Sequence, residues 1–99
     1  MEITLLYFGG CPHWEVADQR VRELAAGRPD ITITHRLVET PEEADRVGFL
    51  GSPSILVDGV DPFAEPGEQP GLSCRRYRTP DGYAGAPTLE QLRAVLGAG

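Results

Sequence analysis

The chain of 99 residues is long enough for one small domain, because a chain of this size cannot bury two cores. Its apolar fraction of 40% and charged fraction of 24% exclude a disordered chain, and no apolar run approaches the roughly 18 residues that a membrane-spanning helix needs. The formal net charge is -6, which argues against a nucleic-acid partner because phosphate binding requires concentrated positive charge. The chain starts without the basic segment of a secretory signal, so we expect a cytoplasmic protein.

The first part of the chain predicts a strand followed by a helix. Residues 3–8, with the sequence ITLLYF, are β-branched, aliphatic and aromatic and end at two glycines, which is typical of a buried strand. Pro12 suits the first turn of a helix, because the N–H that proline lacks is unpaired there in any case. Apolar residues then recur at helical spacing until Gly27 and Pro29, which we expect to end the helix.

A second strand and a second helix follow. Residues 31–39 alternate between the two faces that a strand presents. Thr40 then offers an N-cap hydroxyl, and Glu43, three residues further on, predicts a capping box for a short helix. We expect Gly48 or Gly51 to end this helix.

The remainder of the chain predicts two further strands and a last helix. Residues 54–59 form a third strand that runs into an Asp-Gly turn. Residues 60–71 form a loop rich in proline and glycine, which is either a lid over a site or an insertion. Residues 72–78 predict a fourth strand, and Thr88 with Gln91 predicts the capping box of the final helix.

The predicted order β-α-β-α-β-β-α gives one α/β domain over residues 1–99 with a four-stranded mixed sheet. We expect the first strand to lie centrally, beside the third, with the first helix across the sheet. Cys11 then lies between the carboxyl end of a strand and the amino end of a helix, the usual location of a site in an open α/β sheet. The helix dipole, with His13 if it is cationic, favours the reactive thiolate of Cys11 there. The alternative is that Cys11 is a small buried apolar residue.

These residues resemble the thioredoxin fold across nearly the whole chain. The resemblance rests on the order of the elements, on CPHW after the first strand and on Ser52-Pro53 before the third strand. It implies a cis peptide bond at Pro53, beside Cys11, although only about 5–6% of X–Pro bonds in folded proteins are cis. Trp14 stands where the motif has its second cysteine, so the resemblance implies a monothiol variant of the active-site turn.

Cys74 is a candidate partner for Cys11. The predicted third strand begins near Cys11, and a fourth strand antiparallel to it would carry Cys74 back toward the same end. A turn cysteine paired with a distant hairpin cysteine is also similar to the catalytic domain of alkylmercury lyases, although the aspartate position of that family is Trp14 here. Arg75 or Arg76 would then stabilise a thiolate pair. The alternative is that Cys74 packs in the core or under the proline-rich loop.

We therefore expect a thiol–disulfide oxidoreductase in which Cys11 attacks a substrate disulfide and Cys74 resolves the mixed disulfide. The resemblance implies that the other motif residues position the substrate: Pro12, His13, Trp14, Ser52 and Pro53. The substrate would be a protein or small-molecule thiol or disulfide that pairs with the Ser52 backbone in the manner of a strand, and we expect no cofactor, nucleic acid or membrane partner. Two alternatives stay open. One is a mercury- or copper-binding or organomercurial-lyase-like protein that uses Cys11 and Cys74, and the other is a redox-inert module for protein contacts.

Overall fold

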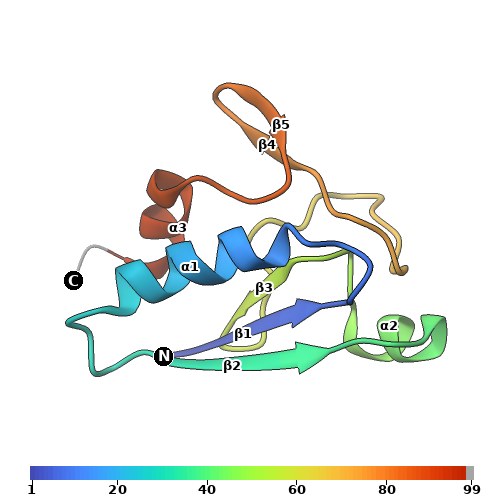
Figure 1. Ribbon diagram of the computed structural model, residues 1–99, viewed down its shortest axis with the longest axis horizontal. Coiled ribbons are helices and arrows are strands. Elements are labelled where there is room, and N and C mark those ends of the chain that lie inside the picture. Colours follow the sequence, from blue (N-terminus) through green and yellow to red (C-terminus); the bar gives the residue numbers. More distant parts are fainter. Residues whose placement is uncertain (98–99) are drawn as a thin grey trace.

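The computed structural model describes residues 1–97, and at its centre lies a three-stranded sheet (Figure 1). In this sheet β1 (Glu2–Tyr7) lies between β2 (Thr32–Leu37) and β3 (Ser54–Val57). β1 pairs in parallel with β2 and antiparallel with β3, so β3 begins at the end of the sheet where β1 ends. The predictions that β1 is central and lies beside β3 are confirmed.

Three helices pack against this sheet within the described residues. α1 (Trp14–Ala25) and α3 (Leu89–Leu96) lie over one face, and α2 (Pro41–Val47) lies at the end of the sheet where β1 ends (Figure 1). Leu5 joins the core cluster of α1 and α3, whereas the adjacent Leu6 points the other way and joins the cluster of α2, because side chains alternate along a strand. None of the helices in residues 1–97 has the length and the apolar character to cross a membrane.

The predicted caps explain where two of the helices begin. The Thr88 hydroxyl accepts from the Gln91 N–H at 3.0 Å, and the Gln91 side chain accepts from the Thr88 N–H at 2.9 Å, which completes the capping box of α3. In α2 the Thr40 hydroxyl accepts from the Glu43 N–H at 3.1 Å, as predicted. The Glu43 carboxylate accepts from the N–H of Glu39 and not from that of Thr40, so the predicted capping box is incomplete. Gly48 then ends α2 in the left-handed conformation, with φ 71.

The predicted fourth strand over residues 72–78 is wrong over most of its length. β4 (Tyr77–Thr79) begins near the end of that range and pairs with β5 (Gly82–Ala84) in a separate two-stranded sheet. The main sheet within residues 1–97 therefore has three strands, where the sequence predicts four. A two-residue turn joins β4 to β5, and β5 itself was not predicted.

The backbone partners of the segment before β4 explain this difference. The Ser73 carbonyl accepts from the Ser52 N–H at 2.7 Å, and the Arg75 N–H donates to the Ser52 carbonyl at 2.9 Å. This segment therefore pairs with the residue that precedes Pro53 and not with β3 itself. The Pro53 carbonyl accepts from the Tyr77 hydroxyl. A side chain, and not the backbone of a fourth strand, therefore contacts the chain just before β3.

Candidate functional site

A disulfide joins Cys11 and Cys74, whose Cα atoms lie 5.7 Å apart although the two residues are 63 positions apart in the sequence. This separation is within the range of about 4.4–6.8 Å that disulfides adopt. The prediction that the two cysteines are neighbours is confirmed, but the predicted route is wrong. Cys74 reaches Cys11 through a single parallel bridge with Ser52 and not through a strand antiparallel to β3.

Cys11 lies in the turn between β1 and α1, and 0% of its surface is exposed. Its N–H donates to the Phe8 carbonyl at 3.3 Å, which closes the turn directly after β1. Its sulfur lies 3.6 Å from the Ser52 carbonyl oxygen. The sulfur of Cys11 is therefore surrounded by the chain itself, on the inner side of the disulfide.

Ser52 and Pro53 lie against Cys11 and are both buried. The peptide bond between them is cis, as predicted. The Ser52 N–H and carbonyl form backbone hydrogen bonds with Ser73 and Arg75. The segment that carries Cys74 therefore occupies the backbone groups of Ser52. This corrects the expectation that Ser52 pairs with the substrate.

The three residues that follow Cys11 have different surroundings. Pro12 lies in the turn before α1 and not in the first helical turn, since its carbonyl accepts a turn-type hydrogen bond from the residue three positions on. The Trp14 ring stacks on an aromatic ring of β1 at a centroid distance of 4.4 Å and packs toward β2. His13 is exposed and lines a pocket together with Cys74. Of these three residues, only His13 lines the pocket beside the disulfide.

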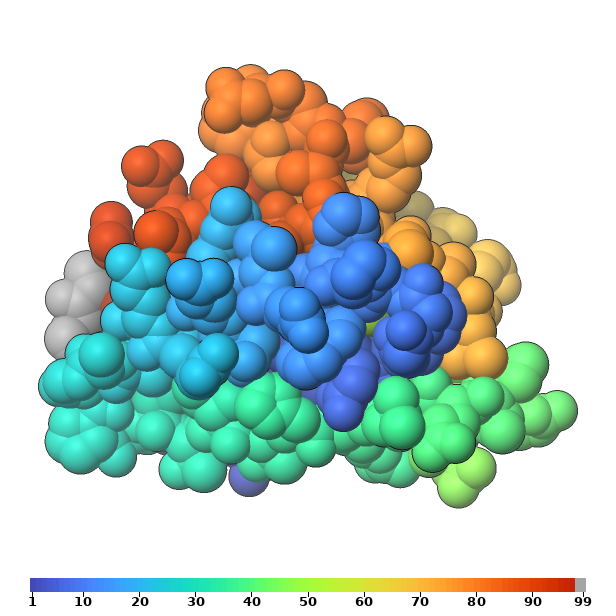
Figure 2. Space-filling model, viewed as in Figure 1, coloured from blue at the N-terminus to red at the C-terminus, as the bar shows by residue number. Residues whose placement is uncertain are grey.

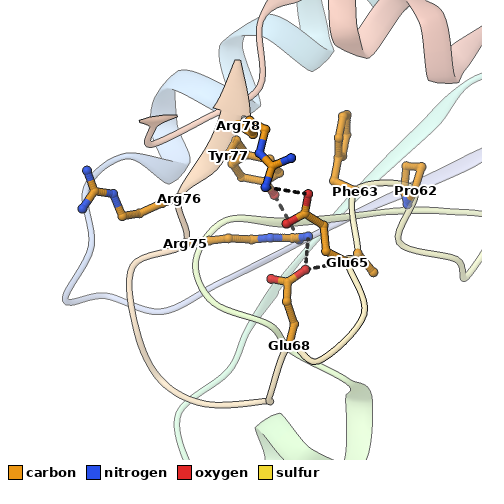
Figure 3. Close-up of a pocket in the computed structure, with 9 residues that line it drawn as sticks. Pro62, Phe63, Glu65, Glu68, Arg75, Arg76, Tyr77 and Arg78 are labelled. Atoms are coloured by element: carbon orange, nitrogen blue, oxygen red, sulfur yellow. Dashed lines mark hydrogen bonds and ion pairs between the residues drawn. The ribbon is translucent and has the colours of Figure 1, made fainter. Parts of the chain in front are cut away.

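Arg75 is buried next to Cys74 and is held by acidic residues of the proline-rich loop (Figure 3). Its guanidinium lies 2.6 Å from the Asp61 carboxylate and 3.7 Å from the Glu68 carboxylate, and the Arg75 side chain is 3% exposed. Asp61 balances this charge, and the expectation that Arg75 or Arg76 stabilises a thiolate pair stays a prediction for the reduced protein. The acidic residues that fix Arg75 were not predicted, and the only signal for them is that a buried arginine needs a carboxylate partner.

Tyr77 extends the same cluster to the beginning of β3. Its hydroxyl accepts from the Arg75 guanidinium at 3.2 Å and donates to the Pro53 carbonyl. Burial raises the pKa of Tyr77 above its usual range, so the hydroxyl stays protonated and keeps its donor role. Tyr77 and Arg75 together fix the segment of Cys74 to the chain around Pro53. We refer below to Asp61, Glu68, Arg75 and Tyr77 as the Arg75 cluster.

Two pockets described within residues 1–97 flank the segment from Cys74 to Arg78. One, of about 300 Å³, lies between this segment and the loop that holds Arg75 (Figure 3). The other, of about 280 Å³, lies beside the disulfide and is called the Cys74 pocket here. The residues that line the Cys74 pocket are His13, Cys74, Arg75, Arg76, Tyr83, Ala84 and Gly85. Cys74 is exposed, and the buried Cys11 is not part of this lining.

The hairpin of β4 and β5 supplies site residues that the sequence did not predict. A Cβ atom on Gly85 would lie 2.6 Å from His13 Cγ, so only glycine allows this close approach to the beginning of α1. Tyr83 is 60% exposed, and the Arg76 guanidinium lies 5.8 Å from the centre of its ring. In the space-filling view the blue surface at the beginning of α1 borders the orange surface of this hairpin (Figure 2). The small residues that surround Gly85 are the one sequence signal for this contact.

Within residues 1–97, no group of three or more histidine, cysteine, aspartate and glutamate side chains is placed to hold a metal ion. The candidate metal ligands from the sequence are Cys11 and Cys74, which offer two sulfur atoms.

Comparison with protein-family models, with curated proteins and with solved structures gives no match for this chain. The resemblances to the thioredoxin fold and to alkylmercury lyases therefore stay predictions from the sequence.

Proposed function

We propose that this chain is a thioredoxin-like thiol–disulfide oxidoreductase whose redox couple is Cys11 and Cys74. The observation that carries the proposal is the disulfide itself, which joins a cysteine buried beside cis-Pro53 to a cysteine on an open pocket. Thiol–disulfide exchange requires a sulfur that a substrate can reach and a second thiol close enough to displace it. Cys74 meets the first requirement and Cys11 meets the second.

The position of the couple supports the thioredoxin-like part of the proposal. Cys11 lies in the turn that follows the central strand, and a cis-proline precedes the strand antiparallel to it. The departure from that fold is also clear, since the second cysteine comes from the segment before the hairpin and not from α1. The couple of this chain thus joins distant segments, whereas the motif it resembles places both thiols within one helical turn.

A catalytic couple explains the disulfide better than a structural one does in the cytoplasmic location that the sequence favours. Structural disulfides are rare in that compartment, where the disulfides that form are usually transient. In the forward reaction the dithiol protein reduces a substrate disulfide to two thiols and itself becomes the Cys11–Cys74 disulfide. Two electrons and two protons pass from the protein to the substrate, so no cofactor is needed.

The test follows the protein thiols during reaction with a neutral small disulfide. Reduced protein is mixed with excess bis(2-hydroxyethyl) disulfide, quenched with iodoacetamide and analysed by mass spectrometry. We expect the wild type to lose both thiols without keeping an adduct, and dithiothreitol to restore both. The single variants Cys11→Ser and Cys74→Ser should not form the internal disulfide. A wild type that keeps its thiols, or that ends as a stable adduct, would show that the two cysteines do not form a redox couple.

The closeness of the two sulfurs also favours a second candidate function, the binding of a soft metal ion. Two thiolates suit two-coordinate Hg(II) or Cu(I). In that case reduced protein would hold one Hg(II) per chain against excess dithiothreitol, and either serine variant would lose it. Loss of the ion from the wild type under the same competition would exclude this candidate.

A further inference from the structure

We infer that substrate exchange takes place at the sulfur of Cys74 and that Arg76 makes the Cys74 pocket favour disulfides that carry negative charge. This inference rests on the proposed function and reverses the roles predicted from the sequence, in which Cys11 attacks and Cys74 resolves.

Burial decides which sulfur a substrate can reach. Cys11 has 0% of its surface exposed, whereas Cys74 is exposed and lines a pocket of about 280 Å³. The rate of thiol–disulfide exchange depends on access to the attacked sulfur. A disulfide substrate that enters the pocket therefore meets Cys74 first, with Cys11 behind it on the inner side.

The reaction then has two balanced steps. The Cys74 thiolate attacks one sulfur of the substrate disulfide, which forms a mixed disulfide and releases the first substrate thiolate. The Cys11 thiolate next attacks the Cys74 sulfur, which forms the Cys11–Cys74 bond and releases the second thiolate. The protein is oxidised by two electrons and the substrate is reduced by two, and the protons of the two protein thiols pass to the two released thiolates.

The charge around the pocket points to the substrate class. Of the basic groups in its lining, the buried Arg75 is balanced by the Asp61 carboxylate at 2.6 Å. Arg76 forms no ion pair within residues 1–97, and its guanidinium lies 5.8 Å from the ring centre of Tyr83. Among the described residues that line the pocket there is no carboxylate. An uncompensated guanidinium at the opening attracts a carboxylate on the substrate.

Gly85 keeps this opening in place. Gly85 directly follows β5 and approaches His13, the residue before α1, and both residues line the pocket. Arg76 and Tyr83 belong to the same side of the molecule, one just before β4 and one in β5. The specificity surface is therefore built from the hairpin, while the sulfur chemistry uses Cys11 and Cys74.

The first arm of the test compares the two single-cysteine variants. Reduced Cys11→Ser, which keeps Cys74, should form a mixed disulfide with bis(2-hydroxyethyl) disulfide at least about tenfold faster than reduced Cys74→Ser, which keeps Cys11. Because a serine variant can lose its fold, the reduced wild type is also labelled with a limiting amount of N-ethylmaleimide and mapped by peptide mass. Label found first on the Cys74 peptide supports the inference, and label found first on the Cys11 peptide overturns it.

The second arm varies the charge of the substrate. Glutathione disulfide is the anionic probe, bis(2-hydroxyethyl) disulfide the neutral probe and cystamine the cationic probe. For Arg76→Gln we expect a loss of about two- to fivefold with the anionic probe and no loss with the neutral probe. Arg93→Gln, which removes an exposed arginine of α3 outside the pocket lining, is the matched control and should change neither rate. Equal effects of Arg76→Gln on all three probes, or none on the anionic probe, would overturn the charge preference.

The two proposals fail in different ways. A wild type that does not exchange with any probe contradicts the proposed oxidoreductase function. A wild type that cycles with two thiols but reacts first at Cys11 leaves that function intact and contradicts only the roles inferred here.

Discussion

Cys11 and Cys74 meet in one disulfide, but the molecule holds them by different means. Cys11 sits in the turn between two regular elements, and a hydrogen bond to Phe8 three residues away fixes its backbone. Cys74 lies in a segment without regular structure. The Arg75 cluster and the bridge to Ser52 fix this segment through residues that are distant in the sequence. Local structure and the core therefore place one sulfur, whereas buried charge and long-range hydrogen bonds place the other. We conclude that the position of Cys74 is the more sensitive part of the site.

The largest expected effect comes from cutting the covalent link between the two regions. The disulfide closes a loop of 63 residues in sequence separation, and loop-closure entropy assigns about 4 kcal/mol to such a link. We expect reduction to lower the free energy of unfolding by about that amount, measured by urea denaturation with and without dithiothreitol. Amide exchange should rise mainly in the Cys74 segment and not in β1. If reduction increases amide exchange equally in the Cys74 segment and in β1, the position of Cys74 is not the more sensitive part of the site.

A slightly smaller loss of stability should follow when the ion pair of the Arg75 cluster is broken. Asp61→Asn leaves the buried guanidinium of Arg75 without its closest carboxylate, and breaking a buried ion pair in this way costs about 3 kcal/mol. Because the cluster positions Cys74, the variant should also make the disulfide easier to reduce in a glutathione buffer, by about tenfold or more. Thr88→Ala is the control, since it removes a helix cap of about 1 kcal/mol at a residue that does not belong to the Arg75 cluster.

Asp61→Asn should change both the urea midpoint and the disulfide equilibrium, whereas Thr88→Ala should change only the urea midpoint. If the two variants shift the disulfide equilibrium equally, the Arg75 cluster does not position Cys74.

The smallest expected effect concerns Tyr77, which links the cluster to Pro53. Tyr77→Phe removes the donor to the Pro53 carbonyl and should cost about 1 kcal/mol. Burial raises the pKa of Tyr77 in the folded protein, so the unfolded chain releases this proton first as the pH rises. The stabilising contribution of the neutral hydroxyl is therefore fully present below about pH 10 and is lost above it. Urea denaturation between pH 8 and pH 11 should show a steeper decline for the wild type than for Tyr77→Phe, and equal slopes would contradict this assignment.

The same division explains which features the sequence could predict. The helix caps at Thr40 and Thr88 and the central strand depend on residues close together in the chain, so local patterns predicted them. The cis bond at Pro53 came from the resemblance to the thioredoxin fold, whereas the proximity of Cys74 came from the expected strand order together with the resemblance to alkylmercury lyases. The path of Cys74 could not be predicted, because it depends on the backbone hydrogen bonds with Ser52 and on the buried pair of Arg75 with Asp61, which join distant parts of the chain.

The pocket residues on the hairpin were out of reach for a related reason. Tyr83 and Gly85 join the site only because the chain directly after β5 approaches His13, and no periodic pattern encodes such a contact. Asp61 likewise belongs to the site only because its carboxylate pairs with Arg75, 14 positions further along the chain. Sequence patterns predicted the three helices, the three strands of the main sheet and the first cysteine, and long-range packing determined the hairpin and the remainder of the site.

The reduction potential of the Cys11–Cys74 couple tests the central claim most directly. Wild-type protein is equilibrated in dithiothreitol and glutathione buffers of defined potential, and the fraction of disulfide is read by alkylation and mass spectrometry. The account predicts a reversible two-electron transition between about -270 and -120 mV, the range of catalytic couples. A midpoint below about -300 mV, where structural disulfides lie, would contradict the claim that this disulfide takes part in exchange.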